Sequence, residues 1–140
     1  MTSGKMPPDE TIRPTSALPI CDPQGIAPLV AVLEDEQVLE IASLCLVDAL
    51  EKTNLAAHAA DIENWSDVAM FAHDVKSSAG QLGATRLQDL AVRLEHNCKI
   101  DGGSRGPELI AAFKEAARLT QTTFDTDKIL EIMALARASL

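Results

Sequence analysis

Apolar residues recur every three or four positions along most of the chain from Asp35 onward. This period is that of an α-helix with one buried face. Between residues 35 and 60 the apolar positions form two adjacent stripes, which comprise Val38, Leu39, Ile41, Ala42, Cys45, Leu46, Ala49 and Leu50. Ala and Leu are abundant, whereas the 140 residues include three Phe, one Trp and no Tyr, a composition that favours packed helices over sheets. The sequence therefore predicts an all-α fold.

Local signals divide the remaining sequence into further helices. Asn64 or Ser66 can cap a second helix, and this helix is expected to stop before Gly83, which suits a left-handed C-terminal position. Thr85 can cap a third helix, and Pro107 suits the first turn of a fourth. Four amphipathic helices of this kind predict an antiparallel up-down four-helix bundle.

The two ends of the chain differ from this regular part. Six of the seven prolines lie near the N-terminus, so we expect residues 1–23 to form a flexible tail and residues 24–140 to form the bundle domain. The short apolar stretch 25–33 predicts a short helix that caps one end of the core. The last seventeen residues either extend the fourth helix or restart at Thr126 or Asp127 as a short C-terminal helix.

Charge and cysteine usage exclude several classes of function. The formal net charge is −9 and no Lys/Arg cluster is present, which argues against nucleic acid as a partner. No segment reaches the roughly 20 apolar residues that span a bilayer, and the N-terminus carries no signal-peptide pattern, so we expect no membrane contact and a cytoplasmic location. Cys21, Cys45 and Cys98 are odd in number and widely spaced, which disfavours disulfides and a thiolate zinc site.

The segment MFAHDVKSSAGQLGA, residues 70–84, carries one histidine among small side chains. On a helical wheel the apolar Phe71, Val75 and Leu82 lie opposite His73, so the imidazole is expected to point outward. Its neighbours on the outward face are Ala69, Lys76, Ser77 and Gly80. Glycine inside a helix costs about 1 kcal/mol relative to alanine, so a bare face with a glycine indicates a surface that another protein approaches closely.

The same segment suggests a chemical role. A neutral imidazole has a free ring nitrogen that can attack a phosphoryl group and form a labile phosphoramidate. A lysine three residues later, Lys76, supplies positive charge for a bound anion. The pattern therefore predicts that His73 is phosphorylated, although an exposed His beside a Lys is also common on solvated helices.

The order of the residues resembles a known motif. His73, Lys76, Ser77, Ser78 and Gly83 follow the pattern H-x-x-K-[GS]-S-x-x-x-x-G of histidine-containing phosphotransfer (HPt) domains of multistep phosphorelays. Many members have glycine where this chain has Ser77. The looser resemblance extends from about residue 26 to residue 124. It implies a four-helix bundle whose exposed histidine takes a phosphoryl group from an aspartyl phosphate on a receiver domain and passes it to another receiver.

The resemblance also implies roles for individual residues. His73 would carry the phosphoryl group on the ring nitrogen distal to the backbone, and Lys76 would stabilise the added charge. Glu95 falls on the next helix, where the family often has a Gln or Glu that holds the other ring nitrogen, but a solvated surface carboxylate is an equally open interpretation. The residues expected at the partner-docking surface are Ala69, Ser77, Gly80, Gly83 and Arg93.

By the same resemblance the chain would be a phosphocarrier without independent turnover, with no nucleotide site, cofactor or metal of its own. Magnesium and the acidic pocket would belong to the receiver domain. Its partners would be response-regulator receiver domains and a hybrid sensor histidine kinase. We expect a monomer, because four helices already close the core.

Three alternatives remain. HDVKSS matches the first four positions of the histidine-kinase motif H-[ED]-x-[KR]-[TN]-P, but Ser78 replaces the proline and no ATP-binding domain follows. A helical adaptor could use the same small-residue face without being phosphorylated. A metal site built from His58, His73, His96 and Cys98 is the least favoured, because no pair has the i, i+4 spacing that places two ligands on one helix face.

Overall fold

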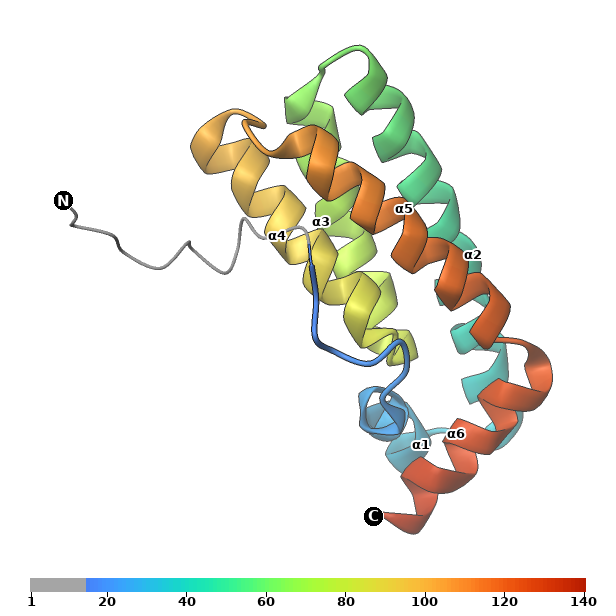
Figure 1. Cartoon of the computed structure of the whole chain (residues 1–140). Coiled ribbons are helices and arrows are strands. Elements are labelled where there is room, and N and C mark those ends of the chain that lie inside the picture. Colours follow the sequence, from blue (N-terminus) through green and yellow to red (C-terminus); the bar gives the residue numbers. More distant parts are fainter. Residues whose placement is uncertain (1–14) are drawn as a thin grey trace, which may run out of the picture.

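The computed structural model describes residues 15–140, and that part of the chain forms helices and no strands. The elements are the 3-10 helix η2 (Pro23–Ile26) and the α-helices α1 (Ala27–Val32), α2 (Asp35–Asp61), α3 (Trp65–Leu82), α4 (Thr85–Asp101), α5 (Gly106–Thr123) and α6 (Thr126–Ala138). The four long helices α2 to α5 lie side by side (Figure 1), and each contacts two neighbours in the closed order α2, α3, α4, α5. The predicted all-α four-helix bundle is confirmed.

The apolar stripes predicted from the sequence meet in the centre of this bundle. Its largest fully buried side chains on α3, α4 and α5 include Val68, Val75, Leu82, Leu87, Leu94, Leu109 and Phe113. Much of the rest of the core is alanine, such as Ala42 and Ala49 on α2 and Ala72 and Ala79 on α3. Because alanine side chains are short, the helices approach closely and hold side chains on adjacent helices within hydrogen-bonding reach of one another.

The helix ends follow the predicted signals except at α4. The Asn64 side chain accepts a backbone hydrogen bond in the first turn of α3, and Gly83 ends α3 in the left-handed region at φ 83°. Thr85 does not cap α4, because Ala84 occupies that position. The Thr85 hydroxyl instead donates to the carbonyl oxygen of Pro19 at 2.7 Å, so it fastens the N-terminal segment to α4.

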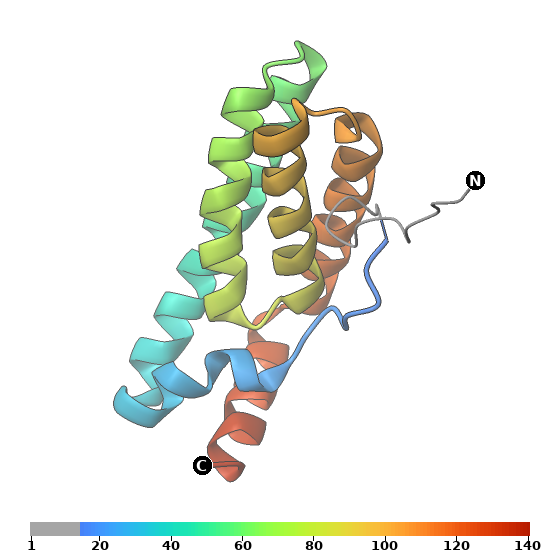
Figure 2. The ribbon, with the colours of Figure 1, turned by 90° about the vertical axis from the view of Figure 1, so that its left-hand side faces the viewer.

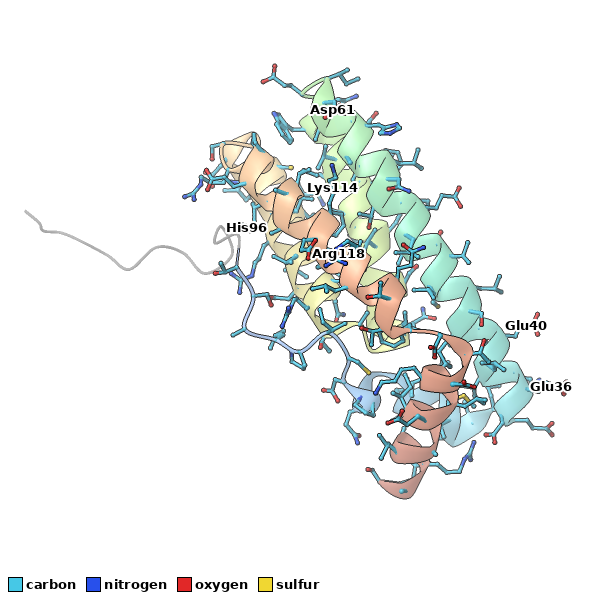
Figure 3. All side chains as sticks on the ribbon, turned by 45° about the vertical axis from the view of Figure 1, so that its right-hand side comes forward. Glu36, Glu40, Asp61, His96, Lys114 and Arg118 are labelled. Carbon is cyan, nitrogen blue, oxygen red and sulfur yellow. The ribbon has the colours of Figure 1, made fainter. Side chains whose placement is uncertain are left out.

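The elements η2, α1 and α6 close one end of the bundle. η2 and α1 pack against α6, and α6 also contacts α2 (Figure 2). α6 is a separate helix that begins at Thr126, where the Asp125 side chain accepts a hydrogen bond from Lys128 N at 2.7 Å. α2 runs the length of the four-helix bundle, with Glu36 and Glu40 near the end that α6 packs on and Asp61 at the opposite end (Figure 3). This end of the core is therefore capped by α1, as predicted, and by α6.

The predicted tail falls into two parts. Residues 1–14 lie outside the described residues. Residues 15–22 contact the bundle: the carbonyl oxygens of Leu18 and Pro19 accept hydrogen bonds from Arg86 at 2.8 and 3.0 Å, and Asp22 N donates to Gly83 O at 2.8 Å. The structured domain therefore begins earlier than residue 24, because the backbone before it is bonded to α4 and to the end of α3.

No helix in the described part of the chain is long and apolar enough to cross a membrane.

Candidate functional site

His73 lies in the middle of α3 with 56% of its side chain exposed. Val75 and Leu82, which the helical wheel placed on the opposite face, are fully buried, and Phe71 is partly buried against the core. The predicted outward orientation of the imidazole is therefore confirmed.

Glu95 projects from α4 onto the imidazole of His73. Its Oε2 atom lies 2.9 Å from His73 Nδ1, and its Oε1 atom accepts a hydrogen bond from Lys76 Nζ at 3.2 Å. The side chain of Glu95 is only 10% exposed. Of the two interpretations that the sequence left open, the structure thus excludes a solvated surface carboxylate and brings His73, Lys76 and Glu95 together.

Lys99 is a fourth member of this cluster that sequence reasoning missed. It lies one turn after Glu95 on α4, and its Nζ donates to Glu95 Oε2 at 2.7 Å, the same oxygen that His73 contacts. The i, i+4 spacing of Glu95 and Lys99 is a signal that could have found it, since such pairs face each other on a helix. The carboxylate therefore has one lysine on each oxygen.

These contacts fix the charge of Glu95. Burial raises the pKa of this carboxyl group, but the hydrogen bonds from Lys99, Lys76 and His73 outweigh burial and lower the pKa to about 2. Glu95 is thus an anion at neutral pH and acts only as an acceptor. In the neutral imidazole the proton must then lie on Nδ1, which donates to Glu95, and the lone pair remains on the exposed Nε2.

Comparison with known protein families gives a match over most of the bundle. A sequence model of the Hpt domain family matches residues 40–123, which include His73, Lys76, Glu95 and Lys99. The chain belongs to this family. No curated protein and no solved structure shows a significant match to the chain. Hpt domains act in phosphotransfer in two-component signalling as carriers without turnover of their own, and they interact with receiver domains and kinases.

Two of the residues predicted for docking, Ser77 and Gly80, lie at the surface on the C-terminal side of His73. Ser77 is exposed and Gly80 is partly exposed. Together with Lys76 they border a hollow of about 480 Å³, which Gln88 of α4 and Leu29 of α1 also line. The bare surface beside the imidazole is therefore a shallow depression between three helices.

Three residues predicted for docking expose little surface. Ala69 is 4% exposed and belongs to the hydrophobic core cluster. Gly83 is buried at the end of α3, where an added Cβ would lie 2.5 Å from the carbonyl oxygen of Asp22, so its role in the Hpt motif is structural. Arg93 donates to Asp89 on its own helix at 3.0 Å and its side chain is 14% exposed, so it is not a solvent-facing cation.

Ser78, the remaining motif residue, also has a structural contact. Its hydroxyl donates to Asp48 Oδ2 of α2 at 2.5 Å. Lys52, one turn after Asp48, lies 3.3 Å from Asp74, the neighbour of His73. These polar contacts tie α3 to α2 on one side of the imidazole, as Glu95 ties it to α4 on the other.

The structure also places the cysteines and the other histidines that the sequence analysis considered as metal ligands. Cys45 and Cys98 are buried free thiols and Cys21 is a partly buried one. His58 is exposed on α2, and His96 is partly buried on α4, at the opposite edge of the bundle from Glu36 and Glu40 (Figure 3). Among residues 15–140, no group of three or more His, Cys, Asp or Glu side chains is placed to hold a metal ion.

Proposed function

We propose that this Hpt domain accepts a phosphoryl group on Nε2 of His73 from the aspartyl phosphate of a receiver domain and passes it to a second receiver. The observation that carries the proposal is the 2.9 Å contact between His73 Nδ1 and the anionic Glu95, which leaves an exposed Nε2 lone pair. A helix core that fixes this orientation makes the imidazole a pre-positioned nucleophile.

In the transfer, the Nε2 lone pair attacks phosphorus and the bond between phosphorus and the aspartyl oxygen breaks. The aspartate leaves as a carboxylate with the electron pair of that bond. No proton moves, because Nδ1 keeps its hydrogen, and the phosphorylated imidazole therefore gains a positive charge. Glu95 stabilises that charge through the contact to Nδ1, and the reverse sequence returns the group to a receiver.

The two lysines have different tasks in this proposal. Lys76 lies on α3 one turn after His73 and holds Glu95 at the longer distance of 3.2 Å, so it can turn towards the incoming phosphoryl group. Lys99 remains on Glu95 at 2.7 Å and keeps the buried carboxylate paired while Lys76 moves. Phosphoryl transfer depends mainly on such positioning and charge neutralisation.

Magnesium and the acidic pocket that activates the aspartyl phosphate are assigned to the receiver domain. The upstream donor is a receiver domain, such as that of a hybrid sensor kinase. This chain then functions as a monomeric carrier between two receivers.

The test uses the full chain and phosphorylated receiver domains from the same organism. We expect the wild type to acquire acid-labile, alkali-stable phosphate and the variant His73→Gln to acquire none. His58→Gln, which removes an exposed histidine of α2, is the matched control and should be labelled as the wild type is. Label that persists in His73→Gln would refute the assignment, and receiver binding without label would favour the docking adaptor.

A further inference from the structure

A second hollow lies on the other side of His73 from the small-residue face. It has a volume of about 610 Å³ and lies between the N-terminal half of α3 and the C-terminal end of α4. Its exposed lining is mostly apolar and includes Trp65, Ala69, Met70 and Cys98, and its polar members are Ser66, His73, Asp74 and Lys99. The phosphoacceptor and this hollow therefore share one surface.

The wall formed by Trp65 is held by the loop between α4 and α5. Added Cβ atoms on Gly103 and Gly106 would each lie within 2.5 Å of the indole, so the ring rests directly on the backbone of this loop. The loop is fixed in turn by the fully buried Asn97, whose side-chain oxygen accepts a hydrogen bond from Arg105 N at 3.1 Å. The hollow is thus preformed rather than created by a movable side chain.

The chain leaves this apolar hollow open. Ala69 and Cys98 are buried at its floor, whereas Met70, a large apolar side chain, is 51% exposed at its edge. A preformed apolar hollow of several hundred Å³ with few polar groups at its edge is typical of a binding site. Single exposed apolar side chains are ordinary, but this one adjoins the reactive imidazole.

The position of His73 indicates the occupant. A receiver that brings its aspartyl phosphate to Nε2 of His73 must lie over the mouth of the hollow, since His73 lines it. Lys99, with 59% of its side chain exposed, places a positive charge at this edge, which complements the acidic site of a receiver. Asp74 also lines the hollow, but its carboxylate is paired with Lys52 at 3.3 Å. Neither a second copy of this acidic chain nor a free apolar molecule would both bring an aspartyl phosphate to His73 and place an acidic site against Lys99.

We propose that the hollow between Trp65 and Met70 receives an apolar side chain of the receiver domain while the aspartyl phosphate lies against His73. This inference rests on the proposed function and adds to it a second contact region, opposite the Ser77 and Gly80 face. The receiver would then contact α3 on both sides of the imidazole. An apolar contact in the hollow and a close backbone approach at the Ser77 and Gly80 face would together orient it.

Trp65 provides a direct measurement, because it is the only tryptophan in the chain. Protein labelled with 5-fluorotryptophan gives one fluorine signal, and we expect this signal to shift when the full chain is titrated with a receiver. A signal that does not move while a receiver binds and exchanges phosphate with His73 would overturn the inference and leave the proposed function intact. A signal that changes with the concentration of this chain alone would assign the hollow to a second copy and would also overturn it.

A substitution provides a second test of this contact. Met70→Gln should raise the KM for the receiver about tenfold through the lost apolar contact, with a smaller effect on kcat. Leu135→Gln on α6 is the matched control, since Leu135 is 50% exposed, and it should leave both constants unchanged. Equal effects of the two substitutions would refute a specific role for the hollow.

Labelling of the wild type by phosphoramidate, which needs no receiver, tests His73 as the acceptor separately. Failure of the proposed function is thereby distinguished from failure of this inference.

Discussion

Glu95→Gln tests whether the charge of the buried carboxylate holds the site together. The pKa of Glu95 falls from 4.5 to about 2 in the folded protein, because hydrogen bonds from the two lysines and His73 exceed the opposing effect of burial. A tenfold change in proton affinity corresponds to about 1.4 kcal/mol, so the lowered pKa represents about 3 kcal/mol at most. Lys76 and Lys99 are 35% and 59% exposed, and solvent screening reduces the expected contribution to roughly 1–2 kcal/mol.

The sign of the pH dependence follows from the direction of the pKa. The folded state favours the ionised form, so the contribution is fully present above pH 4.5 and is lost as the pH falls towards 2. The free energy of unfolding, measured by urea titration with circular dichroism at each pH, should therefore differ between wild type and Glu95→Gln by the full amount at pH 6. The difference should shrink steadily below pH 4.5.

Glu108→Gln is the control for this experiment. Glu108 pairs with Arg105 on an exposed surface, and its pKa is lowered mainly by that hydrogen bond. Removal of this exposed pair should change stability little at any pH. If the difference between wild type and Glu95→Gln stays constant from pH 6 to pH 3, the ionised Glu95 does not contribute as the structure indicates.

Three further substitutions test other parts of the site and the fold. Lys76→Ala should slow transfer and shorten the lifetime of phosphohistidine, measured by loss of label, while lowering stability by less than about 1 kcal/mol because Lys99 still pairs the carboxylate. Gly80→Gln should raise the KM for the receiver by filling the hollow once the flexible Gln88 side chain, 2.5 Å from the added Cβ, has moved aside, and an unchanged KM would contradict docking there. Gly83→Ala should destabilise the fold by more than about 2 kcal/mol, because the new Cβ meets the carbonyl oxygen of Asp22 at 2.5 Å in a left-handed backbone. Gly102→Ala is its control, since Gly102 is also left-handed but has open space around it, and equal losses in urea unfolding would refute the close-approach argument.

The features predicted correctly are those that the sequence of a single helix determines. The helical period of the apolar residues and local end signals such as Asn64 and Gly83 are short-range properties, and they placed the four long helices. The orientation of His73 also followed from a single helical wheel. The separate α6 could not be decided in advance, because extension and restart differ only by the cap that Asp125 forms.

The features missed depend on contacts between helices or with the N-terminal segment. A helical wheel places Ala69 beside His73 but does not show how the other helices pack around it, so its burial was not foreseen. The Thr85 hydroxyl has the chemistry of a cap but bonds to Pro19, which is far away in sequence. The wall of the second hollow likewise arises where Trp65 meets a loop that follows two helices later.

The charges around His73 balance in a way that depends on Glu95 being a carboxylate rather than an amide. Before the proposed transfer, Glu95 carries one negative charge and Lys76 and Lys99 carry two positive charges, so the cluster has a net charge of +1 beside the neutral form of the ring. A phosphoryl group adds a charge of about −2 and the phosphorylated ring gains +1, so the cluster approaches neutrality. With an amide at position 95 both lysines would remain uncompensated before transfer and the cationic ring would lose its anionic partner. In the proposed transfer, the buried carboxylate with a lysine on each oxygen therefore keeps the net charge of the cluster between +1 and about 0 both before and after phosphorylation of His73.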